Sequence, residues 1–110
     1  METGPAVEDV TVRDNSAASR FEVWLGDERV GFADYEMHGE GVVAFPHTLV
    51  EPRFQNRGLA SRLIDEALAA ARDRGWSVLP ECSFVRLHLR RHPGLVDLVP
   101  ASERARFGLA

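Results

Sequence analysis

The residues with the clearest chemical pattern lie at positions 55–61, which read Gln-Asn-Arg-Gly-Leu-Ala-Ser. They directly precede the strongest helical pattern of the chain, so they form the N-terminal end of a predicted helix. The first N–H groups of a helix have no intrahelical partner, and the helix dipole is positive there. Arg57 and Arg62 could add charged hydrogen bonds. Because Gly58 and Ala60 are small, phosphate oxygens could approach this backbone closely, and the segment predicts a pyrophosphate-binding loop.

The same residues have a simpler interpretation, because any helix start exposes free N–H groups. A Gln-x-x-Gly-x-Ala pattern alone is therefore weak evidence for a phosphate site. In this chain the pattern follows a predicted strand and begins an amphipathic helix, which is the context in which phosphate loops occur. The sequence favours a phosphate loop and leaves an ordinary loop as the alternative.

Three other side chains could act as a nucleophile or in proton transfer. Cys82 is the single cysteine of the chain and could act as a nucleophile or a proton donor, although free cysteines are also commonly buried. Glu81 could act as a general base or simply be solvated. Because histidine side chains change charge near neutral pH, His47 could accept a proton. Alternatively, His47 and Thr48 could stabilise the backbone beside Pro46 by hydrogen bonding.

The composition restricts the classes of function. The chain has 110 residues, of which 45% are hydrophobic, and this length suits one domain with a modest core. Its net charge of −4 gives no basic surface for the backbone of a nucleic acid. All 13 basic residues are Arg, which excludes Schiff-base chemistry and the lysine of a Walker-type loop. One cysteine excludes an internal disulfide, and no four-ligand zinc pattern can be assembled, so no metal is expected.

The chain also lacks the signals of secreted and membrane proteins. Its N-terminus is acidic, and no apolar stretch reaches the roughly 18 residues that span a bilayer. We therefore expect a cytoplasmic protein that is a monomer or a weak dimer and binds no membrane. Residues 1–7 are expected to be a disordered leader, residues 8–100 a single domain and residues 101–110 a C-terminal tail.

Hydrophobic periodicity predicts four strands, a helix, a strand and a second helix. They are expected at residues 10–13, 20–25, 30–37, 42–50, 58–74, 76–80 and 84–91. Pro46 should interrupt the fourth strand with a bulge or an edge, because proline cannot donate to a ladder. His88 and His92 are expected at the surface. A helix between the fourth and fifth strands is the crossover that parallel pairing requires, so we predict a mixed, mostly antiparallel α/β fold.

In four ordered segments the chain resembles the GNAT acetyltransferases, and in particular their small members that lack the usual N-terminal helices. The resemblance covers residues 8–99. Its segments are His47-Thr48-x-Val50, Gln55 to Ala60 followed by Ser61, Pro80-x-Cys82-x-Phe84-Val85, and Arg90-Arg91-His92-Pro93.

This resemblance implies a GNAT-like fold that binds acetyl-coenzyme A. The pantetheine arm is then expected between the diverging fourth and fifth strands, the pyrophosphate on the phosphate loop and the thioester near Cys82. The residues expected to contact the coenzyme are Leu49, Val50, Gln55, Asn56, Arg57, Gly58, Leu59, Ala60, Ser61, Arg62 and Arg90. Many larger relatives protonate the coenzyme thiolate with a tyrosine on the last helix. Here the single tyrosine is Tyr35, on the third predicted strand.

The resemblance implies an N-acetyltransferase that uses acetyl-coenzyme A and acetylates a primary amine. Cys82, His47 and Glu81 are its candidate catalytic residues. Without N-terminal helices the acceptor side is open, which suits a protein lysine better than an enclosed small molecule. Two alternatives stay open: a module that binds acetyl-coenzyme A without catalysis, and a purely structural interaction domain.

Overall fold

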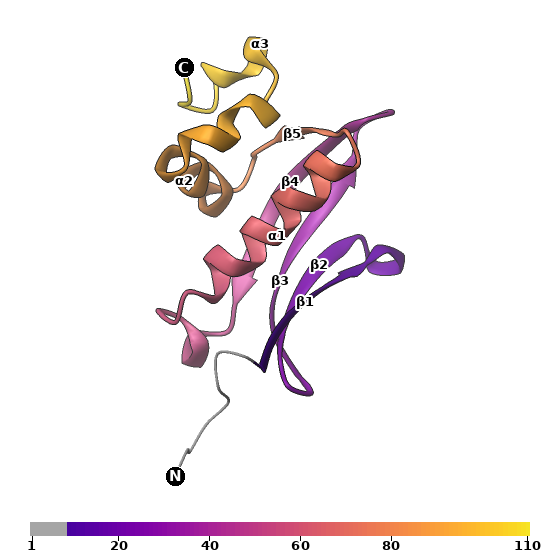
Figure 1. Ribbon diagram of the computed structural model, residues 1–110, viewed down its shortest axis with the longest axis vertical. Coiled ribbons are helices and arrows are strands. Elements are labelled where there is room, and N and C mark those ends of the chain that lie inside the picture. Colours follow the sequence, from indigo (N-terminus) through magenta and orange to yellow (C-terminus); the bar gives the residue numbers. More distant parts are fainter. Residues whose placement is uncertain (1–8) are drawn as a thin grey trace.

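The computed structural model describes residues 9–110, and the predicted leader at residues 1–7 lies outside them. Five strands and three α-helices follow one another, with short 3-10 turns between them (Figure 1). The strands are β1 (Val10–Asn15), β2 (Arg20–Leu25), β3 (Glu28–Met37), β4 (Val42–Val50) and β5 (Ser77–Leu79). The helices are α1 (Leu59–Asp73), α2 (Ser83–Arg91) and α3 (Ala101–Arg104). The 3-10 turns are η2 (Ser16–Ala18), η3 (Pro52–Phe54) and η4 (Pro93–Leu98).

The strands form one mixed sheet in the order β1-β2-β3-β4-β5. The first four are antiparallel, whereas β4 and β5 run parallel, which confirms the predicted topology. The parallel pair is short, because only Val42 to Ala44 of β4 pair with Ser77 to Leu79. The rest of β4 therefore continues beyond its neighbour, and this is the feature that positions the site.

Strand β4 is continuous, so the predicted interruption at Pro46 was wrong, but the predicted bulge is present. Asp34 pairs with His47 and Glu36 pairs with Ala44, so Phe45 and Pro46 together face the single residue Tyr35. A bulge places one residue outside the ladder, and proline fits there because it has no N–H to donate. The strand can thus accept proline without ending.

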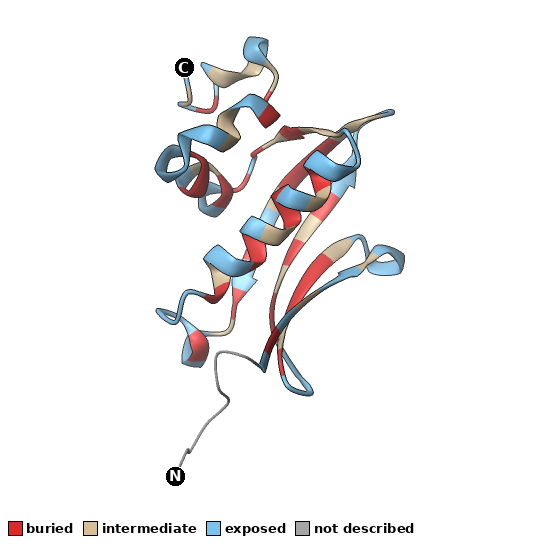
Figure 2. Cartoon of the chain, viewed as in Figure 1, coloured by how far each residue is buried: buried red, intermediate tan, exposed pale blue. Residues whose placement is uncertain are grey.

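Helix α1 is held to the sheet by one apolar face. Its buried residues are Leu59, Leu63, Ile64, Ala67, Leu68 and Ala71, at the spacing of a helix stripe. Each fully buried leucine or isoleucine contributes about 2 kcal/mol. The helix ends where Gly75 takes a left-handed φ of 72°, a conformation that glycine commonly adopts after the last turn of a helix. Buried residues therefore lie where α1 meets the sheet, and exposed ones on the outer side of the helix (Figure 2).

The C-terminal residues pack as helical turns and add no strand to the part of the chain that the structure describes. Turn η4 and helix α3 follow α2 and lie beside it (Figure 1). Leu98, Val99 and Phe107 are buried in the same core as the sheet. The expected tail at residues 101–110 is thus anchored by Phe107.

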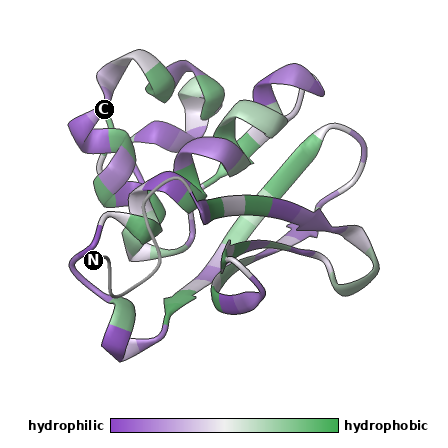
Figure 3. Cartoon of the chain, turned by 60° about the horizontal axis from the view of Figure 1, so that its bottom comes forward, coloured by the Kyte–Doolittle hydropathy of each residue, from purple (hydrophilic) through white to green (hydrophobic). Residues whose placement is uncertain are grey.

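The face of the sheet that α1 does not cover carries a layer of aromatic and guanidinium side chains. Side chains alternate along a strand, and the resulting changes of hydropathy are visible along the ribbon in Figure 3. Phe21 and Val23 point into the core, so Glu22 and Trp24 point to the other face. Arg13 lies 4.3 Å from the centre of the Trp24 ring. Guanidinium and aromatic planes thus cover this face.

Glu22 is at the centre of this layer and is only 4% exposed. Its carboxylate accepts hydrogen bonds from Asn15 Nδ2 at 3.0 Å, Arg20 Nε at 2.8 Å and Trp24 Nε1 at 3.2 Å. Burial alone would raise the pKa of Glu22, but these three hydrogen bonds outweigh it and hold the pKa below the usual 4.5. The folded state therefore favours the charged carboxylate.

We predict that Glu22→Gln lowers the free energy of unfolding at pH 7 by about 1–3 kcal/mol, because three donors lose a charged acceptor. The folded pKa is lowered, so this stabilisation is complete above the usual value of 4.5 and is lost as the pH falls through the folded pKa. Urea unfolding at pH 7 and at pH 3 measures both effects. Glu40→Gln, at an exposed position, is the control, and an equal loss at both pH values would contradict the prediction.

Candidate functional site

The N-terminus of α1 presents free backbone donors. Gly58 is its N-cap residue with a φ of 77°, no side chain caps the helix, and its first turn contains no acidic residue. The Gly58 carbonyl accepts from the N–H of Arg62 at 3.1 Å, which is the first bond of the helix. By helix geometry, the N–H groups of Leu59, Ala60 and Ser61 have no acceptor within the helix. A left-handed Asn56, with a φ of 65°, turns the chain into this end.

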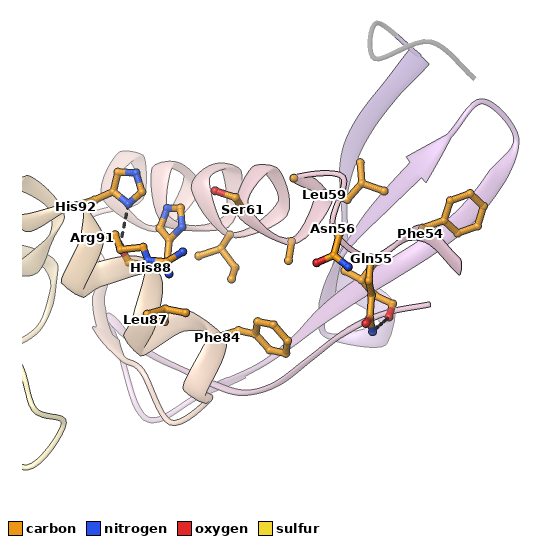
Figure 4. Close-up of a pocket in the computed structure, with 14 residues that line it drawn as sticks. Phe54, Gln55, Asn56, Leu59, Ser61, Phe84, Leu87, His88, Arg91 and His92 are labelled. Carbon is orange, nitrogen blue, oxygen red and sulfur yellow. Dashed lines mark hydrogen bonds between the residues drawn. The ribbon is translucent and has the colours of Figure 1, made fainter. Parts of the chain in front are cut away.

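A pocket of about 400 Å³ opens in front of these donors (Figure 4). It lies between the end of β4, the N-terminus of α1 and one face of α2, and none of its lining residues is acidic. The lining residues are Val50, Phe54, Gln55, Asn56, Gly58, Leu59, Ala60, Ser61, Ile64, Phe84, Leu87, His88, Arg91 and His92. The structure therefore brings together seven of the eleven residues expected to contact the coenzyme.

The other four predicted contacts lie outside the pocket lining, each for a visible reason. Leu49 is 40% exposed and points to the face of the sheet opposite α1. Arg57 lies 5.4 Å from the Phe54 ring centre, and Arg62 Nε pairs with Glu66 at 2.7 Å. Arg90 packs beside Gly108 of the C-terminal segment, whereas its neighbour Arg91 lines the pocket. The sequence showed a run of arginines, and only the helix rotation decides which of them faces the pocket.

Beyond Ala44, β4 has an open edge on its β5 side within residues 9–110. The last link is the Cys82 N–H, which donates to the Phe45 carbonyl at 2.8 Å. The Glu51 N–H donates to the Val30 carbonyl of β3, and backbone groups alternate along a strand. Leu49 therefore directs its backbone to β3, while Thr48 and Val50 direct theirs to the open edge.

Gln55 closes part of this edge. Its Nε2 donates to the Val50 carbonyl at 3.0 Å, shown as a dashed line in Figure 4. The Val50 N–H and both backbone groups of Thr48 remain directed toward the gap. An extended ligand with amide groups could pair with them as an additional strand would.

The three candidate catalytic residues flank the point where β4 and β5 separate. Cys82 is the N-cap residue of α2, is 7% exposed and packs in the core instead of lining the pocket. The side chain of Glu81 is exposed, and its carbonyl accepts from Arg86 Nη1 at 2.6 Å. His47 is exposed on the helix-free face, with its ring centre 5.9 Å from that of Phe32.

Hydrogen bonding by His47 and Thr48 does not stabilise the bulge. Among the described residues the His47 ring has an aromatic contact but no hydrogen bond, and Thr48 Oγ1 is buried without a partner. The alternative structural role for this pair is therefore not supported. The two side chains point to opposite faces of the sheet.

Two histidines of the pocket were missed as site residues. His88 was expected at the surface, but it is 6% exposed and its Nε2 lies 2.7 Å from Asp65 Oδ1 of α1. His92 stacks on His88 with ring centres 4.2 Å apart, and its Nδ1 lies 2.8 Å from the His88 carbonyl (Figure 4). Their spacing of four residues, with His92 directly after the end of α2, was the available signal, since residues four apart at a helix share a face.

Tyr35 has a structural environment. Its hydroxyl donates to Asp14 Oδ1 at 2.9 Å, and its ring contacts Phe21, Phe45 and Trp76. Burial, and then the hydrogen bond to the Asp14 carboxylate, raise the pKa of Tyr35. Tyr35 therefore packs in the core on β3 and does not lie on the last helix.

A family model described as GCN5-related N-acetyl-transferase matches residues 20–98, which include β2, the whole pocket and the end of α2. The chain belongs to this family. It is an N-acetyltransferase, and the predicted family resemblance is confirmed. No curated protein matches this acetyltransferase.

Two solved structures are similar to the acetyltransferase in fold. A GCN5-like protein from Staphylococcus aureus, solved by NMR, is 15% identical with a TM-score of 0.66, covering 86% of this chain and 91% of its own. The Rv2747 protein from Mycobacterium tuberculosis, crystallised in complex with CoA and NLQ, is 16% identical with a TM-score of 0.50, covering 84% of this chain and 72% of its own.

Two further observations concern membrane-spanning helices and metal-binding groups. Within residues 9–110 no helix is long and apolar enough to cross a membrane. The same residues contain no group of three or more His, Cys, Asp or Glu side chains that could hold a metal ion.

We predict that His88→Ala lowers the free energy of unfolding of the acetyltransferase by about 2–3 kcal/mol, because it removes a buried ring and its hydrogen bond to Asp65. Urea denaturation measures this loss. His38→Ala, at an exposed position, should change the value by less than about 0.5 kcal/mol. Equal effects of the two substitutions would show that the His88 contacts do not hold α2 to α1.

Proposed function

We propose that the chain transfers an acetyl group from acetyl-coenzyme A to a primary amine, and that the pocket of α1, α2 and β4 binds the donor. One observation supports this most directly. Free N–H donors at the start of α1 and an unpaired edge of β4 border the same cavity. A coenzyme with a pyrophosphate and an amide-bearing arm has both complementary groups.

The pyrophosphate is assigned to the N–H groups of Leu59, Ala60 and Ser61. Anions are stabilised at a helix N-terminus by unpaired donors and by the helix dipole. Arg91 adds a permanent positive charge to the lining, and no lining residue is acidic. Among the arginines of α2, Arg91 therefore supplies the positive charge of the proposed donor site.

The pantetheine arm is assigned to the edge of β4, between that strand and α2. Phe84 and Leu87 line the pocket with 47% and 41% of their surface exposed, which is high for large apolar residues. The carbon chain of the arm would cover them. The thioester would then lie near Phe45 and Cys82, where β4 and β5 separate.

Transfer requires the unprotonated amine to attack the thioester carbonyl. The new C–N bond forms, the C–S bond breaks, the amine loses a proton and the thiolate gains one.

His47 is the candidate base because it is exposed beside the bulge and its ring has no competing hydrogen bond among the described residues. Cys82 is the candidate proton donor to the thiolate, and its burial favours direct attack by the amine over a covalent acetyl-cysteine. Glu81, exposed at the end of β5, is the second candidate base.

The acceptor is assigned to the helix-free face. His47 lies on this face, and its cross-strand partner Asp34 has a carboxylate on the same face. Asp34 has no hydrogen bond or ion pair to another described residue. An unpaired carboxylate beside a base favours a cationic amine, and an open face can admit the lysine of a protein.

We predict that Gly58→Glu weakens acetyl-coenzyme A binding at least 10-fold, because a carboxylate at the phosphate site repels the ligand. Calorimetric titration measures the dissociation constant. Gly39→Glu is a matched control, since Gly39 has almost the same φ, 78° against 77°, and also has open space around an added Cβ. Unchanged affinity of folded Gly58→Glu would count against the donor site.

We predict that the protein releases free coenzyme A thiol only when an amine acceptor is added. Removing a general base typically costs about 100-fold in rate, so His47→Ala should lower kcat by this order while the affinity for acetyl-coenzyme A stays close to that of the wild type. Thiol release is followed with a chromogenic disulfide across a panel of amines and lysine peptides. Binding without amine-dependent release would indicate a non-enzymatic coenzyme-binding module.

A further inference from the structure

Thr48 has the one buried side-chain polar atom without a partner among the described residues. The residue is 5% exposed, and its Oγ1 has no hydrogen-bond partner. A buried hydroxyl without a partner is unfavourable, and such groups usually bind water or a ligand. The position of Thr48 indicates which of the two it binds.

Thr48 lies between the pocket and the place where the sheet divides. It is two residues from Val50, which lines the pocket, and three from Phe45, which bonds to Cys82. Thr48 and Val50 point to the same face, because strand side chains alternate. At about 3.3 Å per residue, Thr48 is roughly 10 Å from Phe45 along β4.

Three polar groups of this residue are available near the open edge. The Glu51 N–H donates to the Val30 carbonyl of β3, and the backbone groups of successive residues point to alternate sides of a strand. The N–H and C=O of Thr48 therefore point away from β3. Its hydroxyl is on the helix-covered face, where its cross-strand partner Ala33 offers no side-chain acceptor. A ligand that brings an amide to this point could bond to the backbone and to the hydroxyl together.

We propose that the Thr48 hydroxyl donates a hydrogen bond to an amide carbonyl of the pantetheine arm. This rests on the proposed function, which places the thioester near Phe45 and Cys82. The arm carries one amide two chain atoms from the sulfur and a second amide six chain atoms from it, so an arm that extends along β4 from a thioester near Phe45 presents amide groups on the Thr48 side. Thr48 is then a positioning residue that sets how far the acyl group extends into the opening between β4 and β5.

The test compares Thr48→Val with Thr48→Ser. Valine keeps the shape and removes the hydroxyl, whereas serine keeps the hydroxyl. Each protein is titrated with acetyl-coenzyme A and with adenosine 3′,5′-bisphosphate, which lacks the pantetheine arm, and is unfolded in urea. We expect Thr48→Val to bind acetyl-coenzyme A about 5- to 10-fold more weakly, the effect of one hydrogen bond, and to bind the bisphosphate as the wild type does. Thr48→Ser should retain nearly wild-type affinity.

Three outcomes would overturn the proposal. If Thr48→Val binds acetyl-coenzyme A normally and has a higher urea midpoint, the hydroxyl is merely unsatisfied, while the donor site itself stands. If Thr48→Val weakens the two ligands equally, the effect passes through the fold of the pocket. If the wild-type protein binds neither ligand, the proposed function fails together with this inference.

Discussion

The architecture depends on the separation of two parallel strands after three paired residues. Up to Ala44 the sheet is continuous, and the bond from Cys82 to Phe45 closes it. The bulge at Phe45 and Pro46 follows immediately, so β4 changes its course where it loses its neighbour. Three elements that border the pocket lie next to this opening: the end of β4, the loop into α1 and the first turns of α2. If the strands stayed paired, there would be no free backbone for a ligand.

The two sides of the sheet support this opening in different ways. On one side α1 and α2 pack on a continuous apolar core, and the His88–Asp65 pair ties the helices together. On the other side a charged and aromatic layer surrounds Glu22 and takes the place of a helix layer. A small domain can thus keep one side of its sheet accessible without exposing large apolar surface. That accessibility is what an acceptor near His47 requires.

The sequence predicted the four antiparallel strands, the crossover helix, the parallel pair and the glycine loop that begins α1, because these follow from local periodicity and glycine positions. Arg91 could not be distinguished from Arg90, since a short helix with a weak pattern does not fix its own rotation. The burial of His88 depends on Asp65, which is 23 residues earlier in the chain and is brought close only by packing. Likewise, which of Leu49 and Val50 faces the open edge is set by the pairing of β4 with β3. Residues in long-range contacts were missed, and residues in local motifs were found.

Every cationic side chain beside the site is a guanidinium. Arg91 lines the pocket, Arg57 and Arg62 flank the first turn of α1, and Arg13 and Arg20 cover the opposite face of the sheet. A guanidinium stays protonated at any pH at which proteins fold, so it has no lone pair with which to attack a thioester. A lysine at any of these places would attract the same phosphates but would also be a primary amine. At the proposed donor site the positive charge is therefore of a kind that acetyl-coenzyme A cannot acetylate.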